Sequence, residues 1–191
     1  MPVALLGRHQ AANAAVAWAI LDALGEAGIA TAADVVRHAA FADTIWPGRL
    51  ELVRAPGTPD VLLDGAHNPH GVAALAAALE ELLPLLGSSP PVLLMSVLEN
   101  HWQPGMLDPL RAAARGAQLI ATRVPDAPNA LDPARLAMEW GARGRAVDSA
   151  DEGLDAALEQ AARTSAAVVV LGSLYLVGYL RARLIDARAA G

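Results

Sequence analysis

A dense cluster of polar side chains follows the apolar run at residues 61–63. Asp64, His67, Asn68 and His70 all lie before Gly71, where a long Ala/Leu-rich stretch begins. A carboxylate and an imidazole at a strand end can hold ribose hydroxyls, a metal ion or a reacting acid, and ligands bind at the carboxyl ends of strands in open α/β sheets. An Asx turn that starts the next helix would explain the asparagine. Turn chemistry does not require two histidines, so we interpret the segment as a functional site.

Two other motifs carry groups suited to anions. Arg49 follows Trp46-Pro47-Gly48, and an arginine after a rigid turn is suited to meeting a phosphate with its forked donors. On the residues alone, a solvated arginine at a domain hinge is the simpler interpretation. Asn13 comes four residues after His9, so both share one helix face near a helix start, where anions are favoured. There, a helix cap with a polar exposed face is the simpler interpretation.

A fourth motif, Gly172-Ser173-Leu174-Tyr175, follows the apolar run that ends at Leu171. The backbone amides of a helix start and the Ser173 hydroxyl could hold a carboxylate or a phosphate. An ordinary serine N-cap explains the same residue equally well. Ser173 is not expected to be a nucleophile, because the chain has no G-x-S-x-G motif. Sequences typical of dinucleotide turns, P-loops and zinc peptidases are also absent, so these residues do not contain a complete nucleotide-hydrolysing site.

The spacing of apolar residues predicts the elements that position these motifs. Helices are expected over 8–27 and over 31–42, the second with Thr31 as its N-cap. Strands are expected over 50–54, 61–63, 92–97, 119–122, 146–147 and 166–171. Further helices are expected over 71–86, 104–115, 133–142, 152–163 and 174–189. Several strands are continuous apolar runs, which is typical of parallel sheets buried on both faces. The predicted fold is a doubly wound α/β domain after a short helical unit, with a boundary near Ile45.

Composition excludes several function classes. The 191 residues carry a net charge of −6, and all 14 positive side chains are arginines. With no basic stripe, nucleic acid is not an expected partner. Without lysine, the chain can form no Schiff base and no P-loop lysine contact. Charges, glycines or prolines interrupt every apolar run, and the start lacks the basic head of a signal peptide. We therefore expect a cytoplasmic protein with no membrane partner.

The four motifs HQAANAA, WPGRLE, LLDGAHNPHG and LGSLYLVG occur in one order. That order and wording resemble the folylpolyglutamate synthase/dihydrofolate synthase family of Mur-type ligases, from about Leu5 to Arg183. DGAHNPHG and GSLYLVG are the more specific motifs. The resemblance implies a Rossmann-like C-terminal domain with a mostly parallel sheet. Residues 1–45 would be a helical tail of the central ATPase domain, and residues 46–191 the C-terminal glutamate-ligase domain.

The resemblance also implies a reaction. ATP would phosphorylate the carboxylate of a folate or dihydropteroate, and the amine of L-glutamate would attack the acyl phosphate. The implied cofactors are ATP and Mg²⁺, with the metal ligands in the central domain and none here. By position, the implied nucleotide contacts are Asn13, Arg49 and Asp64, the implied catalytic residues are Arg49 and His67, and the implied glutamate contacts are Ser173 and Tyr175. A separate N-terminal ATPase half is a possible partner.

The chain departs from the family at two places in the expected glutamate pocket. Residues 98–102 read Leu-Glu-Asn-His-Trp where the family usually has Asp-Lys-Asp, and residues 128–130 read Pro-Asn-Ala where an arginine often occurs. The leading hypothesis is a ligase chain that supplies only the C-terminal part of the site and is inactive without the ATPase domain. The alternative is a catalytically incompetent paralogue or fragment that binds nucleotides or a partner. A free-standing oxidoreductase is disfavoured, because the glycine-rich dinucleotide turn is missing.

The leading hypothesis has a physical corollary for the helices of residues 8–42. These helices would normally pack on the central domain. Alone, they are expected to leave apolar surface exposed, including Trp18 and Ile20. Large exposed apolar patches drive association, so dimers or aggregates are predicted.

Overall fold

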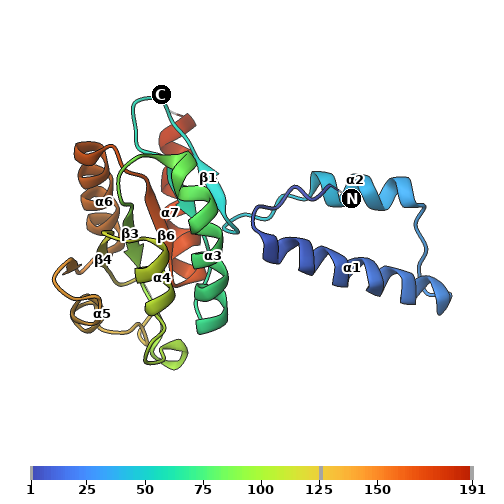
Figure 1. Cartoon of the computed structure of the whole chain (residues 1–191), viewed down its shortest axis with the longest axis horizontal. Helices are drawn as coiled ribbons and strands as arrows, with labels where there is room; N and C mark the ends of the chain where they lie inside the picture. Colours follow the sequence, from blue (N-terminus) through green and yellow to red (C-terminus); the bar gives the residue numbers. More distant parts are fainter. Residues whose placement is uncertain (1, 125–126, 190–191) are drawn as a thin grey trace.

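The computed structural model describes residues 2–124 and 127–189, which form two parts (Figure 1). Helices α1 (Arg8–Glu26) and α2 (Asp34–Asp43) lie side by side and extend away from the rest of the chain. We call residues 2–45 the helical arm. The remaining residues form an α/β domain, called the sheet domain below. The assignment of the arm to a central ATPase domain stays a prediction.

The sheet domain contains six strands in the order β1-β2-β6-β3-β4-β5. Strand β1 is antiparallel to β2, and the other neighbouring strands are parallel. The strands are β1 (Glu51–Val53), β2 (Val61–Leu63), β3 (Val92–Met95), β4 (Gln118–Ala121), β5 (Gly144–Ala146) and β6 (Val168–Leu171). The helices are α3 (Pro69–Leu86), η1 (Glu99–His101), α4 (Asp108–Ala113), α5 (Pro133–Trp140), α6 (Ala150–Thr164) and α7 (Leu174–Ala189). The predicted fold class, a doubly wound and mostly parallel α/β sheet, is confirmed.

Helices cover both faces of the sheet because its strands are apolar on both faces. Successive side chains of a strand point to opposite faces, so Leu93 joins one buried cluster and Leu94 the other. Helices α3, α4 and α5 contribute to the first cluster, and α6 and α7 to the second. Every residue of β2, β3 and β6 is buried. This rigid centre fixes the direction of the loops that leave its carboxyl edge.

Several predicted boundaries need correction. The helix expected over 104–115 is only α4, because Gly105 adopts a left-handed φ of 79° and forms a turn before it. Thr31 is not an N-cap, since the ladder of α2 starts at the carbonyl of Ala33 with no side-chain cap. Helix α5 starts at the predicted residue 133, where Asp132 caps it by accepting a hydrogen bond from the Ala134 amide.

Helix α3 also corrects an expectation about apolar runs. With a mean hydropathy of 1.2, it has the length and composition of a helix that could cross a bilayer. Glu80, Glu81 and Pro84 lie near its end and do not lower the average enough to prevent this. In the fold, the apolar side chains of Val72 and Leu79 are fully buried in the core of the sheet domain.

Candidate functional site

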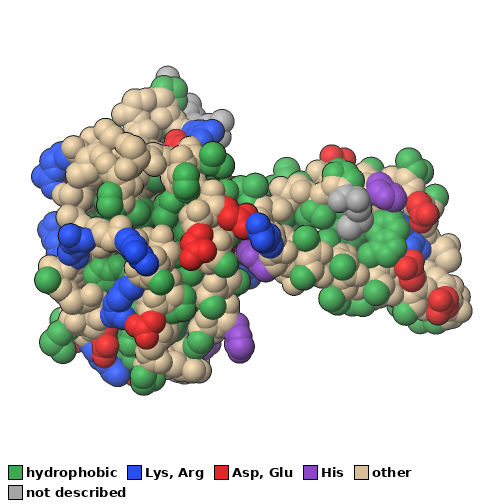
Figure 2. All heavy atoms as spheres, viewed as in Figure 1, with side chains coloured by type: hydrophobic (Ala, Val, Ile, Leu, Met, Phe, Trp, Pro, Cys, Tyr) green, Lys and Arg blue, Asp and Glu red, His purple; other side chains and the backbone are tan. Residues whose placement is uncertain are grey.

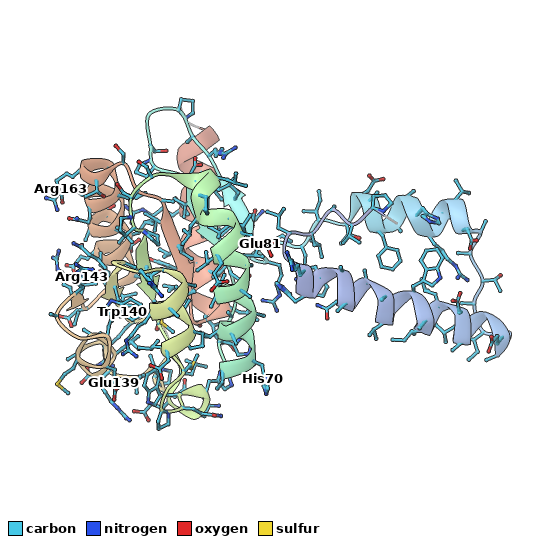
Figure 3. The ribbon with its side chains drawn as sticks, viewed as in Figure 1. His70, Glu81, Glu139, Trp140, Arg143 and Arg163 are labelled. Atoms are coloured by element: carbon cyan, nitrogen blue, oxygen red, sulfur yellow. The ribbon has the colours of Figure 1, made fainter. Side chains whose placement is uncertain are left out.

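A cleft of about 250 Å³ lies where the helical arm meets the carboxyl edge of the sheet. Helix α1 contributes Asn13 to its wall, and the turn of residues 46–50, called the hinge turn below, contributes Arg49. The loop after β2 contributes Asp64 and His67. Four of the six site residues predicted from the sequence therefore line one cleft. His70 does not line it and is exposed at the start of α3 (Figure 3).

Asp64 is a buried carboxylate with two backbone partners. Its Oδ2 accepts a hydrogen bond from the Leu50 amide at 3.0 Å, and its Oδ1 accepts one from the Ala66 amide at 2.8 Å. Burial raises the pKa of Asp64 above its usual range, against the opposing effects of these two amides and the nearby Arg49 and His9. Each carboxylate oxygen can accept more than one hydrogen bond. Asp64 therefore joins the hinge turn to the loop after β2 and still has acceptor capacity.

The Arg49 guanidinium lies over the backbone of Gly65, which has no side chain. A Cβ atom at Gly65 would lie 2.5 Å from Nη1 of Arg49, so a larger residue at this position would displace the guanidinium. None of the ion pairs between described residues involves Arg49. A guanidinium without a carboxylate partner at the wall of a cleft is suited to bidentate contact with a phosphate.

His67 has one ring nitrogen committed to the backbone. Its Nδ1 lies 2.7 Å from the carbonyl oxygen of Gly65. Because a carbonyl only accepts, Nδ1 carries the hydrogen in this contact, and Nε2 of the neutral ring is the acceptor. The residue is half-buried and lines both the cleft and a second, smaller pocket.

The second pocket, of about 70 Å³, contains the predicted glutamate contacts Ser173 and Tyr175. We call it the histidine pocket, because His67 and His101 both line it. The Ser173 oxygen accepts hydrogen bonds from the Tyr175 and Leu176 amides at 3.2 and 3.5 Å, so it caps α7. Its hydroxyl hydrogen remains available to donate. The capping interpretation of Ser173 is therefore confirmed, and a ligand contact by Ser173 or the exposed Tyr175 stays a prediction.

His101 is a residue of this pocket that the sequence reasoning noted only as a departure from the family. Its ring centroid lies 5.0 Å from that of His67. Its Nδ1 is buried and has no hydrogen-bond partner among the described residues. His101 follows β3 at the carboxyl edge of the sheet, and this position was the sequence signal that could have identified it as a site residue.

Helix α1 presents its polar side chains to the cleft as a short network. The Nδ2 of Asn13 donates a hydrogen bond to Oε1 of Gln10 at 3.1 Å, and Nε2 of Gln10 lies 3.1 Å from Nε2 of His9. Gln10 is buried, which the sequence reasoning did not anticipate. The helix begins after Gly7 with no side-chain cap, so the helix-cap interpretation of this motif is wrong. The Oδ1 atom of Asn13 remains free to accept a hydrogen bond from a ligand.

The arm and the sheet domain also meet at an ion pair beside the cleft. Nε of Arg8 on α1 lies 2.7 Å from Oε1 of Glu81 on α3. Figure 3 shows Glu81 on the side of α3 that faces the arm. Both side chains are more than half exposed, so this contact contributes little to stability.

Among the described residues, no group of three or more His, Cys, Asp or Glu side chains could hold a metal ion.

Comparisons with known proteins agree with this architecture. A family model described as "Mur ligase, glutamate ligase domain" matches residues 48–174. The dihydrofolate synthase/folylpolyglutamate synthase of Mycobacterium tuberculosis is 33% identical over 198 residues, covering 93% of this chain and 38% of that relative. The Bacillus subtilis protein of the same name is 30% identical over 180 residues, covering 94% of this chain and 40% of that relative.

Solved structures give the same result. The M. tuberculosis folylpolyglutamate synthase complexed with ADP and AMPPCP has a TM-score of 0.74 at 30% identity, covering 95% of this chain and 41% of that one. The E. coli FolC in complex with DHPP and ADP has a TM-score of 0.72 at 27% identity, covering 99% of this chain and 41% of that one. The chain spans about two fifths of the length of these relatives. It therefore belongs to the Mur ligase family, in the folylpolyglutamate synthase/dihydrofolate synthase group, and corresponds to the C-terminal portion of those proteins.

Proposed function

We propose that this chain supplies part of the active site of a cytoplasmic, ATP-dependent ligase that joins L-glutamate to the carboxylate of a folate or dihydropteroate. The observation that carries the proposal is the cleft in which Asn13, Arg49, Asp64 and His67 meet. The names of the relatives support the substrate class, and the ADP in the related structures supports nucleotide binding.

In the proposed reaction, the γ-phosphoryl group of ATP passes to the substrate carboxylate and leaves ADP. Arg49 would neutralise charge on the phosphates, because its guanidinium forms no ion pair with a described carboxylate. Asn13 and Asp64 would hold the nucleotide through their remaining acceptor atoms.

The second step would take place between the cleft and the histidine pocket. The glutamate amine attacks the carbonyl carbon of the acyl phosphate, the C–N bond forms, and inorganic phosphate leaves. His67 would accept the proton of the amine through Nε2, because its Nδ1 is bound to the Gly65 carbonyl. Ser173 and Tyr175 would donate hydrogen bonds to a glutamate carboxylate in the histidine pocket, whose volume suits one carboxylate group.

The magnesium ion that accompanies ATP would be held outside these residues. Among the described residues, no group of three or more His, Cys, Asp or Glu side chains could hold a metal ion, and Mg²⁺ in nucleotide sites is bound mainly by phosphates, waters and one or two carboxylates. The chain also has no P-loop motif. We therefore expect these 191 residues to need an ATPase domain for ligation.

The alternative function is a binding module for nucleotides or a partner protein, without catalysis. The observation that favours it is His101, whose buried nitrogen has no partner among the described residues and which occupies the altered segment of residues 98–102.

The test is a calorimetric titration of ATP–Mg²⁺ into this chain, with and without the separately expressed central domain of the M. tuberculosis relative. Glutamate-dependent ADP formation only in the mixture supports the shared active site. ADP formation by the chain alone contradicts the shared site. Nucleotide binding without turnover in either sample supports the binding module instead.

A further inference from the structure

Two carboxylates hold the hinge turn on either side of Arg49. Oε2 of Glu51 accepts a hydrogen bond from the Gly48 amide at 2.8 Å. Oδ2 of Asp64 accepts one from the Leu50 amide at 3.0 Å. Arg49 therefore lies between the Gly48 and Leu50 amides, each of which is fixed by a side-chain carboxylate.

The backbone of the hinge turn adopts unusual angles that need such support. Gly48 has a φ of 71°, and Leu50 has a φ of 48°. A left-handed conformation is costly for a residue with a Cβ atom, and it persists only where surrounding contacts impose it. Leu50 is almost completely buried in the core, so its side chain and its amide are both held.

Glu51 is itself held by a residue that lies 130 positions further along the chain. Nε of Arg181 on α7 lies 3.0 Å from Oε1 and 2.8 Å from Oε2 of Glu51. Burial alone would raise the pKa of Glu51, but the hydrogen bonds from Arg181 and Gly48 outweigh it and lower the pKa below its usual value. Glu51 is therefore a carboxylate that is charged at neutral pH and accepts hydrogen bonds on both oxygens.

We propose that Glu51 and Arg181 are positioning residues for Arg49. Arg181 orients the Glu51 carboxylate, this carboxylate fixes the Gly48 amide, and the fixed turn keeps the Arg49 guanidinium over Gly65 at the wall of the cleft. The part of the proposal that concerns nucleotide affinity rests on the proposed function. The part that concerns the hinge turn rests on the geometry alone.

The first experiment measures the hinge turn without any ligand. Amide hydrogen exchange of Gly48 and Leu50 is compared, by NMR, in the whole chain and in the variants Glu51→Gln, Glu51→Ala and Arg181→Ala. We expect about tenfold faster exchange at Gly48 in Arg181→Ala and Glu51→Ala, and a smaller change in Glu51→Gln, which keeps an acceptor oxygen. Unchanged exchange at Gly48 in a folded Arg181→Ala would overturn the proposal.

The matched control is Arg183→Ala on the same helix. Arg183 pairs with Asp151 at 3.0 Å and with Asp155 at 2.6 Å, which are both on α6 and not on the hinge turn. It should leave Gly48 exchange unchanged. Equal acceleration in both arginine variants would mean that α7 is loosened as a whole, and would also overturn the proposal.

The second experiment titrates ADP into the same proteins. We expect Arg181→Ala to weaken ADP binding about fivefold and Arg183→Ala to have no effect, because a displaced guanidinium loses its aligned contact. If ADP does not bind the unmodified chain in the absence of a central domain, the mixing experiment above still decides the proposed function, and the Arg49 Nε–H NMR signal decides the inference. A signal shifted by Arg181→Ala but not by Arg183→Ala supports it, and a signal unmoved by both overturns it.

Discussion

The helical arm and the sheet domain differ sharply in how much of their apolar surface is buried. In the sheet domain, three strands are buried along their whole length. Among the described arm residues, only Gln10 and Ala14 are buried. Val16, Ile20 and Val35 are more than half exposed, and hydrophobic side chains are scattered over the visible face of the arm (Figure 2).

The arm instead holds together through a small cluster around Trp18, with an ion pair between Arg37 of α2 and Asp22 of α1. Trp18 of α1 packs against Phe41 and His38 of α2, with ring centroids 5.9 and 5.1 Å apart, and the Arg37 guanidinium lies over its indole. The expected exposure of apolar surface on one face or the other of these helices is confirmed by Ile20, whereas Trp18 is half-buried in this cluster. The difference teaches that the cleft has one rigid wall and one weakly supported wall.

The largest expected effect tests the stability of the rigid wall. Leu94 is fully buried between strands and helices, so Leu94→Ala should lower the free energy of unfolding by about 3 kcal/mol through lost burial and a cavity. Ile20→Ala on the arm should lower it by less than about 1 kcal/mol, since that side chain is 54% exposed. Urea unfolding followed by circular dichroism measures both. Equal losses would mean that the arm belongs to the same cooperative core.

The next effect concerns nucleotide binding at the rigid wall. Arg49→Ala should weaken ATP–Mg²⁺ binding by about 2 kcal/mol, roughly thirtyfold, as expected for a charged hydrogen bond. Arg54→Ala is the control, because Arg54 pairs with Asp60 and does not line the cleft. Calorimetry on both variants decides the point. Comparable losses would indicate a general charge effect.

A smaller effect should appear in the pH dependence of stability. The pKa of Asp64 is raised above 3.8 in the folded chain, so the folded state binds this proton more tightly than the unfolded state. Its contribution is present below about pH 3.8 and is lost as pH rises through the raised pKa, by about 1.4 kcal/mol for each unit that the pKa is raised. The Asp64→Asn variant should lack this fall in unfolding free energy. Parallel pH profiles for the two proteins would contradict the pKa direction.

The last prediction concerns self-association through the arm. Its substitutions should change the stability of the monomer least. The double variant Val16→Ser and Ile20→Ser should leave unfolding almost unchanged, because both side chains are more than half exposed. It should reduce the dimers or aggregates that we predict for the chain. Light scattering over a range of concentrations measures the mass. A monomeric wild type at the highest concentration would refute the predicted association.

Much of the fold could be predicted because its strands are short apolar runs with clear ends. Strand β2 occupies the predicted residues, β3 starts where its run was predicted to start, and β6 ends where its run was predicted to end. Helix ends were less predictable, because Gly105 and Ala33 set them through backbone geometry. Local composition contains little information about such geometry.

The site was predictable as a location and less so as a set of contacts. The rule that parallel strands end at one edge predicts that the loop with Asp64 and His67 lies near Ser173. Arg49 reaches the same edge only because it precedes β1, which runs antiparallel to β2. The rule does not reveal that the oxygens of Asp64 accept backbone amides, one of them 14 residues away, or that His101 lies beside His67. The Leu50 and His101 contacts depend on how segments that are separated in the sequence pack together.

The strand order has a consequence for synthesis of the chain on the ribosome. Strand β6 is translated after the other five described strands, yet it lies between β2 and β3. Until residues 168–171 leave the exit tunnel, β2 and β3 lack the strand that pairs with both of them. Their apolar side chains therefore stay unburied in the nascent polypeptide. Because long-range parallel pairing is slow and its intermediates expose apolar surface, the interval before β6 emerges is when this polypeptide most needs chaperones.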